Sequence, residues 1–349
     1  MNLTVTTADM RRAGRSQRLK AIAIVCALLA GCAGQTAGSA GQTVTSPTTG
    51  ESPQPSEATF APSPTPSAAL SAKSLIPSPA ESNVPIGLDQ LAGRIAFAFD
   101  DGIWVSDADG RHRRRLTHDG GFDPTFSPDG AQIAYRLLLA ADDGEIWVMD
   151  ANGGNVRDLV NDPEFSDWGP AWSPDGHLIA YDSNRRVGLA IWLMNADGSG
   201  QRIITHGHGE YPSWSPDGKR IAYAGGGYYD LHVTDADGSN DRALTTSAAY
   251  DMGPAWSPDG AWIAYHTQAD YYPDLGEAGM GPEMEIHLVR PDGSDDHRIT
   301  FDRVEDSFPA WSPDGRFLMW SRHGELVVAR PDGSGLVDIG PGNFPTWIR

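Results

Sequence analysis

The stretch that decides the fold is PAWSPDG, which reads identically at residues 170–176, 254–260 and 309–315. Its SPDG part occurs five times, at intervals of 46, 42, 42 and 55 residues, beginning at Ser127, Ser173, Ser215, Ser257 and Ser312. Self-similarity at a period of this size is typical of solenoids and propellers. The first question is therefore whether the repeated aspartate serves chemistry or architecture.

Each period contains four short apolar segments separated by Gly, Pro, Asp and Asn. In one period these are Pro170–Trp172, Leu178–Tyr181, Ile191–Met194 and Arg202–Thr205. Segments this short, β-branched or aromatic, predict strands rather than helices. The first period lacks its Pro-x-aromatic segment, and a sixth copy of that segment stands at residues 345–347. The last strand can therefore complete the first blade and close the ring.

We therefore predict an all-β fold, a six-bladed β-propeller of four-stranded blades over residues 91–349. The SPDG sequence suits a tight turn at each position, because Pro presets φ, Ser and Asp bond the backbone, and Gly accepts a positive φ. A second recurring turn, of the form Asp-Ala-Asp-Gly at residues 107–110, has the same character. A calcium loop would need further oxygen ligands at set positions, which these turns do not have. We interpret both sequences as turns, and His232 and His287 as strand residues.

These repeats resemble the WD-repeat-like propeller repeats of the TolB family, in units of the form PxWSPDGxxIAY followed by IWVMDADGSxxRxLT. The resemblance covers nearly all of residues 91–349. It implies a propeller with a central channel and a role in binding proteins of the cell envelope. TolB carries an α/β domain before its propeller, and residues 33–90 do not resemble one. The resemblance is therefore limited to the propeller domain and does not extend to membership of the Tol complex.

The N-terminus has the pattern of an export signal. A basic stretch ends at Lys20, an apolar run follows at residues 21–29, and the sequence LAGC then ends at Cys32. The run is too short to span a bilayer. LAGC resembles the bacterial lipobox, which implies cleavage before Cys32 and lipid on its sulfur. We thus expect a signal peptide at residues 1–31 and an extracytoplasmic protein anchored either to an outer membrane or to the outer leaflet of the cytoplasmic membrane.

The segment that follows, residues 32–90, consists of the lipidated Cys32 and a Ser/Thr/Pro/Ala-rich linker. This composition cannot form a core, so we expect a disordered tether. The chain is acidic, with 46 Asp+Glu, 26 Lys+Arg and a formal net charge of −20. Such a charge disfavours nucleic acid and favours cationic partners. The only cysteines are Cys26 and Cys32, so the mature fold has no disulfide.

Variation among the repeats indicates where function lies. We letter the four strands of a blade A to D in the order of the repeat, starting from the Pro-x-aromatic segment. The A–B and C–D turns are nearly uniform, whereas the B–C connections range from Phe99–Gly102 through Leu137–Glu145 to the long insertion Gln268–Met284. Variable loops on a rigid scaffold usually carry binding. We therefore predict a binding surface on the propeller face formed by the B–C and D–A connections.

Acidic residues precede the recurring proline in five D–A connections, and we expect them to form a ring at one mouth of the channel: Asp123, Asp167, Glu210, Asp251, Glu305 and Asp306. This ring is either a solvated rim or a focused negative potential that attracts a cation or a basic peptide. Neighbouring aromatic residues could add to a binding surface: Trp168, Tyr211, Tyr250, Tyr271 and Tyr272.

One short motif has the composition of a metal or acid–base site. His206, His208 and Glu210 alternate along an extended loop and could bind a divalent cation. An ordinary glycine-rich loop is the simpler interpretation. His266 lies near the insertion and could join such a site.

Three functions remain open, and the sequence has no nucleophile elbow or phosphate-binding loop that would settle them. The first is a lipid-anchored module, monomeric, that binds an envelope protein or peptide. The second is an enzyme at the channel mouth, of the polysaccharide lyase or metal-dependent hydrolase type. The third is a structural envelope protein. The lack of a convincing catalytic set favours the binding module.

Overall fold

The computed structural model describes residues 84–349, except 119, 141–142, 161, 163, 187, 228, 247–248, 269–283 and 303. The expected signal peptide, Cys32 and nearly all of the tether lie outside the described residues. One short 3-10 helix, η2, spans Leu88–Gln90. No helix in the described ranges is long and apolar enough to cross a bilayer.

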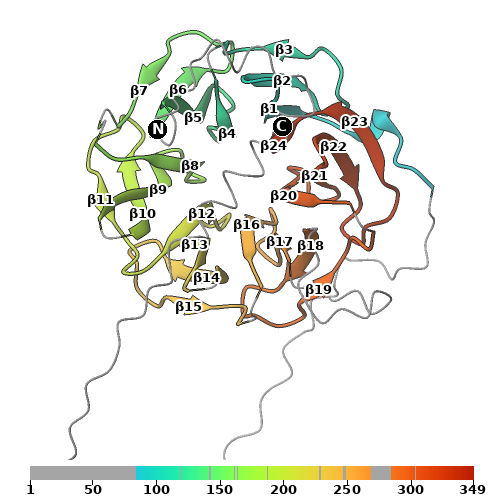
Figure 1. The fold of residues 1–349 in the computed structure, drawn as a ribbon. Coiled ribbons are helices and arrows are strands. Elements are labelled where there is room, and N and C mark those ends of the chain that lie inside the picture. Colours follow the sequence, from blue (N-terminus) through green and yellow to red (C-terminus); the bar gives the residue numbers. More distant parts are fainter. Residues whose placement is uncertain are drawn as a thin grey trace, which may run out of the picture. The chain divides into compact units, whose positions relative to one another are not determined.

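Within the described residues, twenty-four strands form six antiparallel four-stranded sheets arranged as the blades of a ring (Figure 1). The first blade consists of β24 (Asn343–Ile348), β1 (Arg94–Ala98), β2 (Ile103–Asp107) and β3 (Arg114–Arg115). The second has β4 (Phe122–Phe126), β5 (Gln132–Ala140), β6 (Asp143–Asp150) and β7 (Arg157–Asp158). The third has β8 (Asp167–Trp172), β9 (Leu178–Arg186), β10 (Gly188–Asn195) and β11 (Arg202–Ile203).

The other three blades follow the same order. The fourth consists of β12 (Gly209–Trp214), β13 (Arg220–Gly225), β14 (Asp230–Asp235) and β15 (Arg242–Ala243). The fifth has β16 (Asp251–Trp256), β17 (Ile263–Thr267), β18 (Glu285–Val289) and β19 (His297–Arg298). The sixth has β20 (Asp306–Trp311), β21 (Leu318–Arg322), β22 (Glu325–Ala329) and β23 (Val337–Pro341). The predicted fold class is confirmed.

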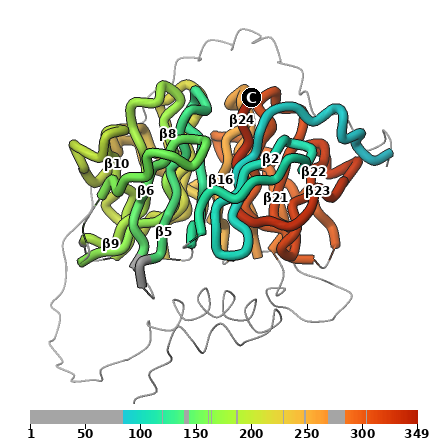
Figure 2. Tube along the Cα trace, turned by 90° about the horizontal axis from the view of Figure 1, so that it is seen from above, coloured from blue at the N-terminus to red at the C-terminus, as the bar shows by residue number. Residues whose placement is uncertain are grey.

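The ring is closed as the sequence predicts. Strand β24 pairs antiparallel with β1, with Ile95 opposite Trp347. The indole Nε1 of Trp347 donates a hydrogen bond to the Ala92 carbonyl, 2.9 Å away. Strands near the two ends of the propeller thus share one sheet, and β1 keeps no unpaired inner edge. The first strand of every blade lies nearest the axis in Figure 1, and Figure 2 shows the same ring turned by 90°.

The five SPDG sequences form one turn with the same set of hydrogen bonds. In blade 3, Ser173 Oγ donates to Asp175 Oδ1 at 2.6 Å, and the Leu178 amide donates to Ser173 Oγ at 2.9 Å. The equivalent pairs in the other four turns measure 2.6–2.7 Å and 2.9 Å. Each of these aspartate carboxylates is hydrogen-bonded within its own turn, so the repeated PAWSPDG sequence serves the fold and is not a chemical site.

The core lies between neighbouring blades. Isoleucines and tyrosines of the second strands and the apolar residues of the third strands are almost fully buried. The tryptophan before SPDG contributes a polar contact in blade 4, where Trp214 Nε1 donates to the Ala171 carbonyl of blade 3 at 3.1 Å. In four blades a threonine after the fourth strand accepts a hydrogen bond from a backbone amide of the third strand, for example Thr205 from Ile191 at 2.9 Å.

Glycines of the C–D turns fix the distance between blades. Gly238 has a φ of +86°, and a Cβ atom added there would lie 2.2 Å from the Ile204 carbonyl oxygen of the preceding blade. Gly198 and Gly333 make the same approach to Leu159 and Ile299. The glycine is therefore needed both for the turn conformation and for contact between blades.

We expect Gly238→Ala to destabilise the propeller more than Gly324→Ala. Gly324 has a matching φ of +87° but nothing within 4 Å of the added Cβ, so it isolates the cost of the conformation, about 1 kcal/mol. Gly238→Ala should add roughly 1–3 kcal/mol for the steric overlap. Urea unfolding of both variants measures the difference, and equal losses would show that the contact between blades is not tight.

Candidate functional site

Each innermost strand carries a β-bulge at the residue before its proline. The pairing register of all six strands shifts at this point. Proline lacks an amide hydrogen and breaks the ladder, which is consistent with a bulge. The residues at the bulge have φ values of 51–60°, and we call them the inner ring: Asp123, Gly169, Tyr211, Gly253, Phe308 and Phe344.

Aromatic side chains of the inner ring meet across the ring. The Tyr211 and Phe308 ring centroids lie 5.6 Å apart, although blade 5 separates the two residues. Phe308 and Phe344 are closer, at 4.2 Å. Contact between residues of non-adjacent blades requires that these side chains point toward the axis. The inner ring therefore forms an axial constriction that is aromatic over blades 4, 6 and 1.

The second strand of each blade supplies a residue directly behind the inner ring. Its side chain is large where the inner-ring residue is glycine. A Cβ added at Gly169 would lie 2.6 Å from Asp182 Oδ1, and one at Gly253 would lie 2.8 Å from His266 Cε1. Asp182 and His266 thus occupy the space that a larger inner-ring side chain would need.

These second-strand side chains also hold the bulge of the next blade. The Tyr211 amide donates to Asp182 Oδ1 at 3.2 Å, and the Phe308 amide donates to His266 Nδ1 at 3.3 Å. Ser321 Oγ accepts from the Phe344 amide at 3.1 Å in the same way. The contacts couple neighbouring blades at residues with a positive φ, so they position the inner ring.

The other side of the constriction is charged. Arg136 Nε lies 3.2 Å from Asp123 Oδ2, and the Arg136 guanidinium lies over the Phe122 ring at 5.0 Å. Burial raises the pKa of Asp182 well above its usual range, and the charge of Glu210 raises it further. Burial also raises the pKa of Asp123, against the opposing effect of Arg136. Asp182 thus lies within electrostatic range of two other carboxyl groups, those of Asp123 and Glu210, and of one arginine, Arg136.

His266 contributes no charge to the constriction. Its side chain is fully buried, and burial lowers its pKa to about 3. Because Nδ1 accepts the Phe308 amide, the proton of the neutral ring is on Nε2. His266 is therefore a neutral side chain that packs on Phe308, with ring centroids 4.8 Å apart.

The six predicted acidic residues do not occupy one equivalent position. Asp167, Asp251 and Asp306 begin β8, β16 and β20 and are at most 2% exposed. Glu210 is the second residue of β12, Glu305 is exposed just before β20, and only Asp123 belongs to the inner ring. The bulge explains the difference, because one residue more or less before the proline moves a side chain to another environment.

The three buried aspartates are engaged within the fold. Asp167 Oδ2 lies 3.0 Å from Arg185 Nη2. Asp306 Oδ1 accepts a hydrogen bond from Trp320 Nε1 at 2.7 Å, and Arg322 Nη1 lies 3.8 Å from Oδ2. Burial raises the pKa of Asp167 to about 6 and that of Asp306 to about 7, with the arginines acting in the opposite direction. Burial raises the pKa of Asp251 too.

The predicted aromatic residues do not share one location in the structure. Tyr211 belongs to the constriction, whereas Trp168 is the second residue of β8. Tyr250 packs on Tyr229 with centroids 5.5 Å apart, and Tyr229 meets the His208 ring at 4.7 Å. Tyr271 and Tyr272 lie outside the described residues.

Only two of the three residues of the predicted metal motif contact each other. His208 Nε2 lies 2.9 Å from Glu210 Oε1, while His206 is exposed. Within the part of the chain that the structure describes, no three His, Cys, Asp or Glu side chains are arranged to hold a metal ion. A divalent cation at this motif stays a prediction.

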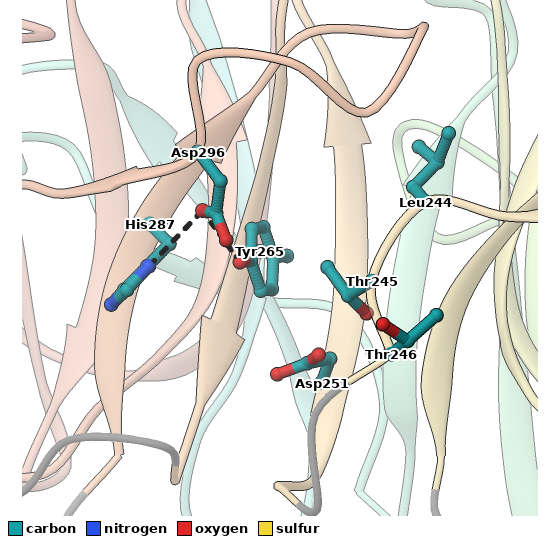
Figure 3. Close-up of a pocket in the computed structure, with 7 residues that line it drawn as sticks. All are labelled: Leu244, Thr245, Thr246, Asp251, Tyr265, His287 and Asp296. Carbon is teal, nitrogen blue, oxygen red and sulfur yellow. Dashed lines mark hydrogen bonds and ion pairs between the residues drawn. The ribbon is translucent and has the colours of Figure 1, made fainter.

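A separate pocket has a volume of about 330 Å³ (Figure 3). Its lining residues are Leu244, Thr245, Thr246, Asp251, Tyr265, His287 and Asp296. Tyr265 donates from its hydroxyl to Asp296 Oδ1 at 2.8 Å, and His287 Nδ1 lies 3.3 Å from the same oxygen. Blade 4 repeats this arrangement with Tyr223, His232 and Asp241. Recurrence in two blades indicates a structural network, and both histidines are strand residues as predicted.

Sequence reasoning missed Arg136, Asp182, Phe308 and Phe344. The available signal was the residue immediately before each recurring proline, together with its partner on the following strand. Counting acidic residues near the proline obscured that pattern.

Comparison with known proteins agrees with this fold. A model of the TolB β-propeller domain matches residues 98–228. The chain carries a TolB-like propeller domain. A protein of Agrobacterium tumefaciens assigned as TolB aligns with a TM-score of 0.58 and 23% identity, covering 72% of this chain and 90% of that one. TolB of Acinetobacter baumannii aligns with a TM-score of 0.62 and 20% identity, covering 74% and 67%.

The TolB-like propeller also resembles a chain of a nidogen/laminin complex. The TM-score is 0.56 at 12% identity, covering 73% of this chain and 98% of that one. At such identities the likeness concerns the fold alone. The TolB-like propeller is therefore an architecture shared by proteins of widely different sequence.

We expect Asp306→Asn to flatten the pH dependence of stability. The pKa of Asp306 is about 7 in the fold against a usual 3.8, so the folded state binds more protons between these values and wild-type stability falls as pH rises through this range. The variant lacks this group and should lose less stability. Urea unfolding at pH 5 and pH 7 measures both slopes. The control is Asp89→Asn at an exposed position, and parallel curves for all three proteins would contradict the expectation.

Proposed function

We propose that this chain is an extracytoplasmic lipoprotein whose propeller acts as a monomeric protein- or peptide-binding module. Binding would occur on the face formed by the B–C and D–A connections. The observation that carries the proposal is the contrast between the two faces of a TolB-like propeller. One face consists of repeated turns whose polar groups are satisfied internally, while the other varies from blade to blade.

The hairpins of blades 2 and 3 contribute to this contrast. Strands β5 and β9 have nine residues each and β6 and β10 have eight, whereas second and third strands elsewhere have five or six. The segment Leu137–Glu145, expected as a loop, is therefore strand except at 141–142. Longer hairpins extend the B–C side of two blades further than in the other blades. This face is therefore uneven in a way that a partner could recognise.

Exposed apolar side chains also support the B–C/D–A face as the binding surface. Phe301 lies in the D–A connection after β19 and is 75% exposed, the largest value among the exposed large hydrophobic residues described. Leu138, near the B–C end of β5, is 37% exposed. Aromatic residues are enriched at protein interfaces and often carry much of the binding energy.

The cellular location follows from the N-terminal pattern. The sequence LAGC at residues 29–32 supports lipid attachment at Cys32, and the similarity to TolB agrees with an envelope protein. The proline-rich residues 33–90 would then separate the propeller from the membrane. An acidic propeller repels anionic lipid headgroups, which favours a partner-binding role over membrane binding by the propeller itself.

A photo-crosslinking amino acid should capture a partner from one face only. We expect covalent adducts when it replaces Phe301 on the B–C/D–A face and none when it replaces Val156, which is 49% exposed in a C–D connection. The measurement is mass spectrometry of adducts formed in intact cells that express the full chain. Equal adduct formation at both positions would argue against a dedicated face.

Replacing Cys32 should release the protein from the membrane. We expect Cys32→Ala to abolish incorporation of a labelled fatty acid and to move the protein to the soluble fraction, because no thiol remains for lipid attachment. Gel fluorography and membrane fractionation measure both effects. Cys26→Ala, within the expected signal, is the matched control, and labelling that survives in Cys32→Ala would refute the anchor.

A further inference from the structure

We propose that the axial constriction binds a lysine ammonium group of the protein partner, between the carboxylates of Asp123 and Glu210 and the rings of Tyr211, Phe308 and Phe344. This inference rests on the proposed function and names the chemical group that the binding module recognises. It concerns the interior of the constriction and not the outer acidic rim.

A buried acceptor without a partner marks the position of the charge. Asp123 has only 10% of its side chain exposed, and its Oδ2 faces Arg136. Its other oxygen, Oδ1, is buried and makes no hydrogen bond of its own with the described residues, although a hydrogen bond from the Gly169 backbone to the carboxyl group acts to lower its pKa. Leaving a buried acceptor unsatisfied costs about 1–3 kcal/mol. A donor from a ligand would remove that cost, so the site favours a ligand over an empty state.

The cluster has more carboxyl groups than positively charged side chains, so one more cation would bring its charge closer to neutral. Asp123, Asp182 and Glu210 face a single arginine, Arg136. His208 lies 2.9 Å from Glu210 at the outer side of the cluster. Glu210 keeps 14% of its side chain exposed, so it lies between the interior and solvent.

The geometry favours ammonium over the alternatives. A divalent metal needs several converging ligands, and no such group exists among the described residues. A guanidinium binds best to a carboxylate with two open oxygens, but Arg136 already occupies Oδ2 of Asp123. An ammonium is a compact point donor, and it suits a single open oxygen.

The aromatic side of the constriction fits the rest of the lysine side chain. Tyr211, Phe308 and Phe344 form a continuous series of ring contacts at 5.6 and 4.2 Å. Methylene groups pack on such rings, and an ammonium is attracted to their faces. An acidic side and an aromatic side together distinguish a lysine from both a plain hydrophobic residue and a free inorganic cation.

Binding should also displace a proton. The groups that face Asp182 are Glu210 and the Tyr211 amide from β12, Asp123 from β4 and Arg136 from β5. Burial and the Glu210 charge raise the pKa of Asp182. An entering cation opposes both effects and favours the ionised carboxylate. Proton release is therefore a signature that a purely structural role for Asp182 would not produce.

Titration calorimetry of the full chain tests the inference with three small probes, the N-acetyl N-methylamides of lysine, norleucine and arginine. We expect the lysine probe to bind about tenfold more tightly than the other two, the value of one charge-assisted hydrogen bond. Asp123→Asn should reduce its affinity about tenfold. Glu210→Gln is a second variant at a more exposed position, and Asp89→Asn is the control that should leave affinity unchanged.

The same titrations in two buffers of different ionisation enthalpy measure proton release. We expect release on binding to wild type and its loss in Asp182→Asn. Absence of saturable lysine binding, equal binding of norleucine, or affinity unchanged in both Asp123→Asn and Glu210→Gln would overturn the inference. These results do not depend on a partner, so failure here with successful crosslinking at Phe301 would reject the lysine subsite and leave the proposed function standing.

Discussion

Pairing of β24 with β1 is the interaction on which the rest of the structure depends. Without it, the first blade would have three strands and an exposed edge, and the apolar residues between blades 6 and 1 would lose their cover. The contact between Trp347 and Ala92 joins residues 255 positions apart. Closing a loop of that length costs about 5 kcal/mol of chain entropy. Hydrogen bonds and burial along the whole strand must offset this cost, and only then does the ring hold its six bulges around one axis.

The sequence was sufficient to predict the fold because the repeat fixes local structure and strand count together. SPDG has one turn that satisfies its own Ser, Asp and Gly, and the same hydrogen bonds recur in all five copies. The missing strand of the first repeat and the surplus strand at residues 343–348 imply closure without further information. Local rules and global topology agree, as expected of a sequence that specifies one fold.

The candidate site was predicted only in part, because it depends on geometry that the repeat does not display. Asp123 and Tyr211 were identified from their position near the proline. Asp167, Asp251 and Asp306 share that neighbourhood in sequence, but they begin their strands in buried positions. Asp182 was missed because it lies on a second strand and reaches the axis only over Gly169. A bulge changes which side chains face the axis, and the bulge is visible only in the strand register.

The left-handed backbone at the inner ring has a consequence for how this protein can change. Blades 3 and 5 place glycine there, and glycine adopts a positive φ without strain. Asp123, Tyr211, Phe308 and Phe344 adopt it with a side chain, at a cost of about 1–2 kcal/mol each. Glycine at these four positions would remove that cost, but it would also remove the ring contacts at 5.6 and 4.2 Å and the pairing of Asp123 with Arg136. Any substitution at the centre of this propeller therefore exchanges backbone strain for lost side-chain contacts, as expected where strain persists because the surrounding structure holds it in place.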